Sequence, residues 1–303
     1  MEIKENVPLH DKNWFGTGGA ARFFAQPQTA QEFADALEFA YTNKLEHCIL
    51  GHGANVLISD AGFDGLIIQP DISTISFNNS LVTAGSGVGV PELITSTLNH
   101  NLIGFEDFSG IPGTVGGAVF INLHYFERLI GNDLIWATII EKSSRNILIV
   151  DQSWFNFGYN TTTLHAKEHY LIDATFKLKP ATDLETSFAR GRAFEIIRHR
   201  NSRYPKARTC GSFFRNFLPE ELDKKNTIPA VGLYLEKIGA KNLRVRSAGV
   251  SPRHNNMIVT DTTNAQSRDI IELAIMMQRM VFEAFGLLPQ TECQFIGFNE
   301  KPL

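Results

Sequence analysis

The chain has 303 residues, of which 43% are hydrophobic and 20% are charged, and its formal net charge is -4 at pH 7. This length allows a large buried core and predicts about two or three domains. Because the balance is slightly acidic and no run of Lys or Arg occurs, the chain lacks the positive field that holds a phosphate backbone. We therefore do not expect a nucleic-acid partner.

The N-terminal residues, the apolar stretches and the cysteines favour a cytoplasmic protein without a metal site. Residues 1–6 mix charges and lack the basic start and apolar stretch of a secretory signal. The longest apolar stretch, residues 110–121, is interrupted by Pro112 and several glycines and is shorter than the ~20 residues of a membrane-spanning helix. Cys48, Cys210 and Cys293 lie far apart, which indicates neither a zinc site nor a disulfide framework. We expect these thiols in or near the core.

The pattern of residues 1–70 predicts a small α/β domain. Thr29 is the expected N-cap of a helix that extends to Thr42, and Glu32 stands where it would complete a capping box. The expected strands are Arg22–Ala25, His47–Leu50, Val56–Ser59 and Leu66–Gln69.

Residues 71–180 predict a second, strand-rich domain with one clear helix, Pro91–Asn99, in which Pro91 suits the first turn. The expected strands include Leu81–Ala84, Trp136–Glu141, Ile147–Val150 and Tyr170–Leu178.

Residues 181–303 predict a third, α+β domain. A helical, Arg-rich stretch covers Ser187–Arg200, and an amphipathic helix covers Ser267–Phe285. Six residues recur at helical spacing in the second helix and are expected to pack in the core: Ile270, Leu273, Met277, Met280, Val281 and Ala284.

Two glycine loops lie between predicted elements. Residues 51–55, Gly-His-Gly-Ala-Asn, connect two apolar strands. Successive N–H groups in such a turn can form a concave anion site that a pyrophosphate approaches closely, although a plain connection between strands has the same composition. Residues 84–90 precede a helix, but Val90 stands where a dinucleotide fingerprint starting at Gly85 requires glycine. A Rossmann domain is therefore disfavoured.

The third glycine segment is the most specific. Residues 109–118, Ser-Gly-Ile-Pro-Gly-Thr-Val-Gly-Gly-Ala, hold too many glycines around Pro112 for a normal helix or central strand. We expect the backbone of this loop to recognise a second phosphate and to lie against a flat ring system.

In chain order, residues 51–55, residues 109–118 and four further motifs resemble the UDP-N-acetylenolpyruvoylglucosamine reductases over nearly the whole chain. The further motifs are Gly16-Thr17-Gly18-Gly19, Phe157-Gly158-Tyr159, Gly211-Ser212-Phe213-Phe214-Arg215-Asn216 and the C-terminal Glu292. The resemblance implies an α+β chain with a FAD-binding fold of the vanillyl-alcohol-oxidase type and a C-terminal α+β domain for the substrate. Its domains would be 1–70 and 71–180 for FAD, and 181–303 for the substrate.

The resemblance also implies an activity. NADPH would reduce FAD, and hydride from flavin N5 would convert the enolpyruvyl ether of a UDP-sugar into UDP-N-acetylmuramate for peptidoglycan synthesis. Hydride addition leaves an enolate-like carbanion that needs charge stabilisation and then a proton. The family motif assigns the proton donor to Ser212 and the acidic residue at the reacting end to Glu292, although a lone carboxylate there could also be a solvated surface group.

The expected protein is a cytoplasmic monomer whose partner is a small-molecule UDP-sugar. Its expected substrate contacts are Tyr159, Arg203, Arg208, Arg215 and Asn216. Its expected FAD contacts are Gly51, His52, Gly53, Ala54, Asn55, Val56, Gly85, Ser109, Gly110, Ile111, Pro112, Gly113, Thr114, Gly116, Gly117 and Ala118.

The chain departs from the family pattern in segments that should face the substrate. Asn160 follows the Phe-Gly-Tyr motif where the family usually has an arginine directed at the substrate carboxylate. A hydrogen bond to a charged group contributes about 1.5–3 kcal/mol, so we expect another cation to replace the missing arginine. The candidates are Arg128, Arg203 and Arg208, and Arg208 is favoured. Residues 123–126 are bulky where the family has small residues, and Phe217 stands in place of a proline.

Two alternatives follow from these departures. The chain could be a related flavin oxidoreductase with a different substrate, since fold does not fix function. It could also be a non-catalytic flavin-binding or nucleotide-binding protein, but a binding protein has no need for the proton donor Ser212.

Overall fold

The computed structural model describes the whole chain except residues 126, 206–207 and 261–264. The chain divides into two compact units, each built from three segments. Unit 1 comprises Met1–Glu5, Phe23–His52 and Gly65–Arg200, and unit 2 comprises Asn6–Arg22, Gly53–Asp64 and Asn201–Leu303. The expected boundaries at residues 70 and 180 both fall within unit 1, and the three-domain division stays a prediction.

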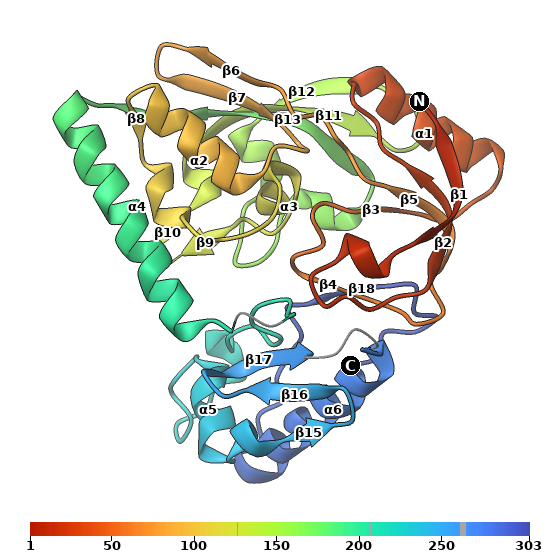
Figure 1. Ribbon diagram of the computed structural model, residues 1–303, viewed down its shortest axis with the longest axis vertical. Helices are drawn as coiled ribbons and strands as arrows, with labels where there is room; N and C mark the ends of the chain where they lie inside the picture. The colour runs from red at the N-terminus through yellow and green to blue at the C-terminus, as the bar shows by residue number, and fades with distance from the viewer. Residues whose placement is uncertain (126, 206–207, 261–264) are drawn as a thin grey trace. The chain divides into compact units, whose positions relative to one another are not determined.

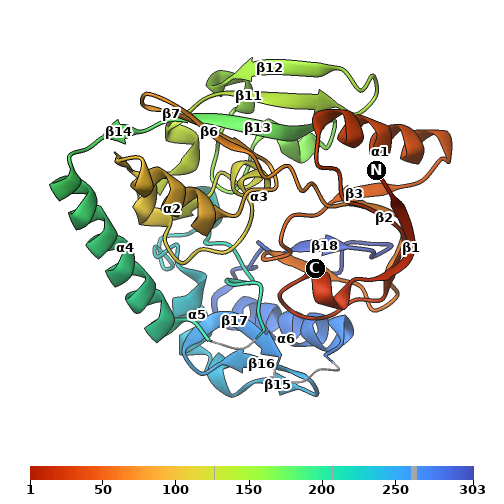
Figure 2. The same cartoon turned by 45° about the horizontal axis from the view of Figure 1, so that its top comes forward.

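An antiparallel five-stranded sheet, in the order β12-β11-β13-β7-β6, forms the centre of unit 1. Both ribbon views show helices α2 (Val90–Asn99) and α3 (Val115–Phe120) on the same face of this sheet (Figures 1 and 2). That face is apolar, and residues such as Val82, Ala137 and Phe176 are fully buried in the core between the layers. The strands are β6 Ile75–Asn78, β7 Leu81–Gly85, β11 Leu134–Glu141, β12 Ile147–Asp151 and β13 His169–Lys177.

A second sheet has the order β1-β2-β5-β3, and its strand β3 pairs in parallel with β5. These strands are β1 Ile3–Pro8, β2 Ala20–Ala25, β3 His47–Ile49 and β5 Phe63–Ile68. Helix α1 (Ala30–Thr42) buries Phe33 and Leu37 in the core that Leu66 and Ile68 of β5 also form. As expected, Thr29 caps α1 by accepting from Glu32 N at 3.1 Å. The Glu32 carboxylate reaches back to Gln28 N at 2.7 Å, one residue before the N-cap.

Helix α4 (Asp183–Arg203) contains the predicted range 187–200 and extends it at both ends. The earlier start has a local cause that the sequence pattern contains. Glu185 N donates to Thr182 Oγ1 at 3.2 Å, and Thr182 N donates to the Glu185 carboxylate at 2.8 Å, which is a capping box one turn before the predicted start. Short strands complete unit 1: β8 Leu102–Ile103 with β14 Lys179–Pro180, and β9 His124–Tyr125 with β10 Arg128–Leu129.

Unit 2 contains an antiparallel sheet in the order β15-β16-β17 and the parallel pair β4 and β18. Helix α6 (Ser267–Phe285) has the predicted bounds and buries Ile270, Leu273, Met277 and Val281, whereas Ala284 is exposed. Asp60 caps this helix by accepting from Ser267 N at 2.7 Å. The other elements are β4 Val56–Ile58, β15 Arg244–Val245, β16 Ala248–Ser251, β17 His254–Thr260, β18 Gln294–Ile296 and helix α5 Val231–Lys237.

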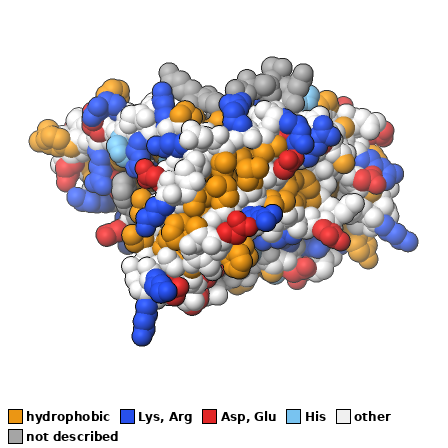
Figure 3. All heavy atoms as spheres, turned by 90° about the horizontal axis from the view of Figure 1, so that it is seen from below, with side chains coloured by type: hydrophobic (Ala, Val, Ile, Leu, Met, Phe, Trp, Pro, Cys, Tyr) orange, Lys and Arg blue, Asp and Glu red, His pale blue; other side chains and the backbone are white. Residues whose placement is uncertain are grey.

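Surface and thiols agree with a folded globular chain. Unit 2 exposes hydrophobic side chains on α5 and α6, namely Leu233, Ile275, Met276 and Phe282. Figure 3 shows hydrophobic side chains gathered between charged ones on the face seen from below.

Cys210 and Cys293 are buried and Cys48 is half-buried, as expected for thiols in or near the core. No helix in the described ranges is long and apolar enough to cross a membrane.

Candidate active site

Unit 1 brings three glycine segments together at residues 51–52, 85–89 and 113–117. A Cβ atom added at Gly51 would lie 2.7 Å from Thr114 Oγ1, so the first and third segments touch at a glycine. A Cβ atom at Gly89 would lie 3.6 Å from His52 Cε1, an ordinary van der Waals distance, so the second segment also neighbours the first. The close approach at Gly51 explains why a residue without a side chain stands there.

Backbone hydrogen bonds hold the second segment against the third. Val90 N donates to Gly113 O at 3.0 Å, and Val115 N donates to Val88 O at 2.8 Å. Gly116 N donates to Ser86 O at 2.9 Å. A Cβ atom at Gly116 would meet that same oxygen at 3.1 Å, so a larger residue there requires the backbone of Ser86 to shift slightly.

The prediction that residues 109–118 contain no normal helix is wrong at the end of this range. Helix α3 begins at Val115 and includes Gly116, Gly117 and Ala118. Thr114 provides the N-cap, because its Oγ1 accepts from Gly117 N at 3.2 Å. Tertiary contact with the second glycine segment therefore overrides the weak helix propensity of the two glycines.

The first half of the third segment is a loop that glycine conformations shape. Gly110 and Gly113 have φ of +78° and +127°, which other residues rarely adopt. Ile111 and Pro112 lie between them, and Ser109 N donates to Glu106 O at 3.1 Å. An added Cβ atom at Gly113 meets no atom within 4 Å, so this turn borders open space.

The donor groups of these loops fit an anionic dinucleotide cofactor. None of the N–H groups of residues 51–55 donates a hydrogen bond within the described part of the chain. Successive free N–H groups in a glycine turn form a site that accepts phosphate oxygens. Ser86 Oγ is buried and also has no hydrogen-bond partner among the described residues, as expected for a group that a ligand would satisfy.

Residues 53–56 belong to unit 2, where they approach the Glu292 segment. Gly53 has φ of +66°, and a Cβ atom there would lie 2.2 Å from Lys12 O. Asn55 O accepts from Gln294 N at 3.0 Å, and Asn55 Nδ2 donates to Glu292 O at 3.4 Å. The next residue, Val56, begins strand β4, which pairs with β18. A residue expected to contact FAD thus contacts the backbone of the expected acidic residue.

Ser212 and Glu292 lie on neighbouring extended segments of unit 2. Phe214 forms an antiparallel bridge with Thr291, and Arg215 N donates to Gln290 O at 2.9 Å. Phe213 O accepts from both Glu292 N at 2.9 Å and Cys293 N at 3.4 Å. Two donors on one carbonyl interrupt regular pairing, as in a β-bulge, which turns side chains away from strict alternation. The fold thus places two residues distant in sequence on adjacent extended segments.

Asn256 holds the Ser212 segment and was missed in the sequence analysis. Its side chain accepts from Phe214 N at 3.0 Å and donates to Phe214 O at 2.7 Å, in the manner of a neighbouring strand. Its own carbonyl accepts from Phe213 N at 2.8 Å. Asn256 is only 3% exposed, so its role is to hold the backbone of this segment in place and not to contact solvent. Only its place on β17 reveals this role, which no local motif signals.

Asn160 lies at the tip of a tight turn in unit 1. Gly158 N donates to Thr161 O at 2.9 Å, and Asn160 has φ of +54°. Both amide atoms of Asn160 are buried and lack a hydrogen-bond partner in the described part of the structure. The preceding residue, Tyr159, is 38% exposed, and its ring centroid lies 5.0 Å from that of His124.

The arginines expected to assist the substrate differ in their surroundings. Arg128 donates to the Asp133 carboxylate at 2.7 Å and is thereby neutralised. Arg215 makes two short hydrogen bonds to Glu221, and this contact lowers the pKa of Glu221. Arg203, like Asn216, is exposed on unit 2.

Arg208 packs against the first glycine motif. It is exposed, and its Nη1 atom would lie 2.2 Å from a Cβ atom added at Gly16. Its carbonyl accepts from Thr260 N at 3.0 Å, which fixes the backbone. Gly16 thus leaves room for the guanidinium, a contact that the sequence alone did not indicate.

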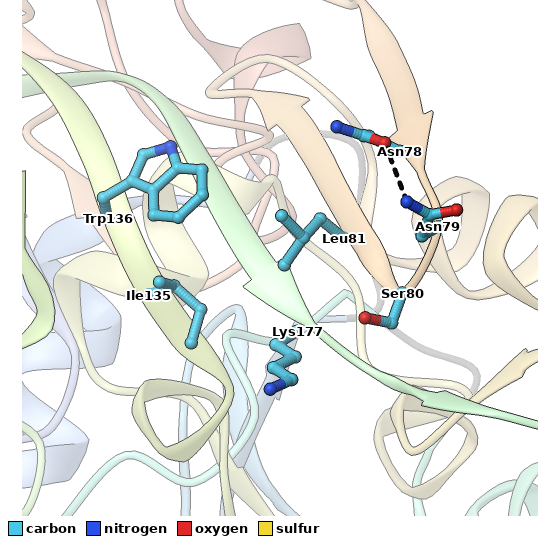
Figure 4. Close-up of a pocket in the computed structure, with 7 residues that line it drawn as sticks. All are labelled: Asn78, Asn79, Ser80, Leu81, Ile135, Trp136 and Lys177. Atoms are coloured by element: carbon cyan, nitrogen blue, oxygen red, sulfur yellow. Dashed lines mark hydrogen bonds between the residues drawn. The ribbon is translucent and has the colours of Figure 1, made fainter.

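A surface pocket of about 350 Å³ lies elsewhere in unit 1 (Figure 4). It borders strands β6, β7, β11 and β13, and no predicted site residue lines it. Asn79 Nδ2 donates to Asn78 Oδ1 at 3.2 Å at its edge. The lining residues are Asn78, Asn79, Ser80, Leu81, Ile135, Trp136 and Lys177.

Known proteins resemble this chain along almost its whole length. A reductase of Prochlorococcus marinus named UDP-N-acetylenolpyruvoylglucosamine reductase is 31% identical, with 98% of this chain and 99% of that protein covered. The Listeria monocytogenes protein of the same name is 30% identical over 98% of this chain and 96% of its own length. This chain belongs to the UDP-N-acetylenolpyruvoylglucosamine reductase family.

Domain and structure comparisons agree with family membership. Residues 21–138 match the family described as FAD binding domain, and residues 203–296 match the C-terminal domain of UDP-N-acetylenolpyruvoylglucosamine reductase. The crystal structure of the reductase from Thermus caldophilus covers 98% of this chain with a TM-score of 0.80 at 24% identity. The expected FAD-binding fold with a C-terminal α+β domain is confirmed.

Proposed function

We propose that this chain is a FAD-dependent oxidoreductase that uses NADPH to reduce UDP-N-acetylenolpyruvoylglucosamine to UDP-N-acetylmuramate in peptidoglycan synthesis. The observation that carries the proposal is the pairing in unit 2 of the Ser212 segment with the Glu292 segment, through Phe213 O. It is supported by full-length similarity to proteins with this name. The enzyme would act in the cytoplasm as a monomer on a small-molecule UDP-sugar.

The glycine segments would hold FAD through their backbones. The free N–H groups of residues 51–55 would bind phosphate oxygens, and the loop around Gly113 would let a flat ring approach the chain. Bound FAD would supply hydride transfer to the enolpyruvyl double bond. Because hydrogen bonds fix the second and third glycine segments to one another, these two segments need little reorganisation to bind the cofactor.

Ser212 would hold the proton that completes reduction of the double bond. A serine hydroxyl is a weak acid, so it requires a fixed position and polar neighbours to donate efficiently. Asn256 fixes the backbone immediately after Ser212. Glu292, on the adjacent segment, would orient the reacting end of the substrate and help to replenish the proton.

The decisive experiment uses the purified holoenzyme. We expect a flavin absorption spectrum, bleaching on anaerobic addition of NADPH, and reappearance of the oxidised spectrum on addition of UDP-N-acetylenolpyruvoylglucosamine. A protein that binds FAD and is reduced, but is never reoxidised by this sugar, would have a different substrate. A protein that binds FAD without reduction would be the non-catalytic alternative.

A further inference from the structure

Two segments of unit 1 that depart from the family pattern are joined by hydrogen bonds. Asn122 Nδ2 donates to Gly158 O at 3.0 Å, and Gly131 N donates to Asn122 Oδ1 at 3.2 Å. Thr162 Oγ1 donates to Phe120 O at 3.0 Å. The segment of His124 and the turn of Asn160 are therefore joined in one hydrogen-bonded junction, although 36 residues separate them in the sequence.

Unpartnered polar atoms gather at this junction. His124 packs its ring against Tyr159, and Asn160 follows Tyr159 directly. Three polar atoms here, His124 Nδ1 and the two amide atoms of Asn160, are buried and have no hydrogen-bond partner among the residues that the structure describes. Buried polar groups are nearly always satisfied in native proteins, so such a concentration indicates groups that a ligand satisfies.

The junction is neutral. Asn160 carries no charge, and burial lowers the pKa of His124, with an opposing contribution from the backbone of Asn122. The nearby guanidinium of Arg128 is paired with Asp133. Neutral hydrogen-bond donors that are fixed before the reaction stabilise oxygen atoms on which negative charge develops. A neutral imidazole can act in this way.

We propose that His124 and Asn160 form a two-donor site for the oxygen on which negative charge develops during reduction of the substrate. His124 would donate from Nδ1 and Asn160 from Nδ2. This inference rests on the proposed function. Hydride adds to one carbon of the enolpyruvyl double bond, and the electron pair of the π bond moves to the other carbon and the adjacent carboxylate. The two donors stabilise the negative charge that develops on the carboxylate oxygen. A proton then forms the second C–H bond and restores the carboxylate.

The test separates the two half-reactions in stopped-flow experiments on holoenzyme. His124→Phe keeps a ring against Tyr159 but removes both nitrogens, and Asn160→Gly keeps the left-handed backbone but removes the amide. We expect each variant to be reduced by NADPH at the wild-type rate and reoxidised by the enolpyruvyl sugar about 100-fold more slowly. Affinity for the product UDP-N-acetylmuramate should change less than about 5-fold, because the donors act mainly when charge develops.

A matched control and a rescue exclude a structural effect. His100 stacks on Phe77 in the same unit, with ring centroids 3.6 Å apart, so His100→Phe should leave both half-reactions unchanged. Asn160→Arg should restore reoxidation in the His124→Phe background by supplying a charged donor. Normal reoxidation by both single variants would overturn the two-donor site. Failure of the wild-type enzyme to be reoxidised would overturn the proposed function instead.

Discussion

Ser212 provides the most direct test of the proposed chemistry at the scale of a single residue. Ser212→Ala should leave reduction of FAD by NADPH nearly intact, because the hydroxyl acts only after hydride has left the flavin. Reoxidation by the enolpyruvyl sugar should slow by about 100-fold or more, the usual contribution of a general acid. Stopped-flow absorbance resolves the reductive and oxidative half-reactions. Ser187→Ala, on the exposed face of α4, serves as the control. Equal losses in both halves would assign Ser212 a structural role or a flavin contact.

Arg208 is our candidate for the cation that pairs with the substrate carboxylate. Its guanidinium lies over Gly16 and is exposed. A hydrogen bond to a charged group contributes about 1.5–3 kcal/mol, so Arg208→Ala should raise the KM for the sugar by about 10-fold or more and slow reoxidation. Arg279→Ala removes an exposed arginine that is paired with Glu283 and serves as control. If Arg208→Ala is reoxidised normally, another segment supplies the cation.

The thiols make the pH dependence of stability predictable. Burial raises the pKa of Cys48 to about 11, and burial beside Cys210 raises the pKa of Cys293. The folded state therefore retains these protons after the unfolded chain has lost them, so the thiols contribute stability below pH ~9 that disappears as the pH rises toward 11. Urea unfolding between pH 8 and 11 should show a falling free energy of unfolding. Replacing Cys48 and Cys293 by Ala should flatten this slope, and an unchanged slope would contradict the assignment.

At the scale of elements, the fold of the site depends on a side-chain amide that makes the hydrogen bonds a neighbouring strand would otherwise make. Asn256 gives Phe214 both a donor and an acceptor from β17. Asn256→Ala removes both partners in a buried location, where each unsatisfied group costs about 1–3 kcal/mol. We expect urea unfolding to show a loss of about 2–4 kcal/mol, whereas Asn78→Ala on the exposed strand β6 should cost almost nothing. A loss near zero would mean that water or a relaxed backbone replaces Asn256.

The elements that the sequence predicts well are those with local signals. The bounds of α6 follow from its helical period and from Gly286, which ends it with φ of +71°. The start of α1 follows from Thr29. Helix α3 was missed because its two glycines oppose helix formation, and contacts with the second glycine segment, distant in sequence, decide the outcome. The same limit applies to the contact of Asn256 with Phe214, which only the pairing of β17 creates.

For the whole molecule, the sequence predicts which residue types belong to the site. It predicts less well which other residues those side chains and backbones contact. Glycine density correctly indicates segments whose backbones approach other groups, as Gly51 does with Thr114. It does not reveal that His124 meets Tyr159, or that Arg208 lies over Gly16. The first contact arises within one segment of unit 1, where the chain folds back on itself, and the second joins two separate segments of unit 2. The spacing of residues along one sequence does not indicate which distant residues such folding brings into contact.

Non-covalent binding of FAD is the prediction that tests the glycine segments of the whole protein together. The purified protein should be yellow, and acid precipitation should release the colour into the supernatant, because these segments offer backbone donors and only His52 as an attachment site. Added FAD at 100 times its Kd should stabilise the apoprotein by about 2.7 kcal/mol. Retained colour in the precipitate would refute non-covalent binding and make His52 the first residue to replace.

Two glycine variants show whether the segments themselves hold the cofactor. Gly51→Ala places a methyl group 2.7 Å from Thr114 Oγ1, so either the two loops move apart or the Thr114 side chain gives up its N-cap bond to Gly117, and we expect both to disturb the flavin site. We expect the Kd for FAD to rise by about 10-fold or more, which corresponds to about 1.4 kcal/mol. Gly191→Ala adds the same methyl group to α4, where no atom lies within 4 Å, and should leave FAD affinity unchanged while stabilising the helix slightly. Titration of apoprotein with FAD, followed by flavin fluorescence, measures both. Equal affinities for Gly51→Ala and Gly191→Ala would show that contact between the first and third segments is unnecessary for the flavin site.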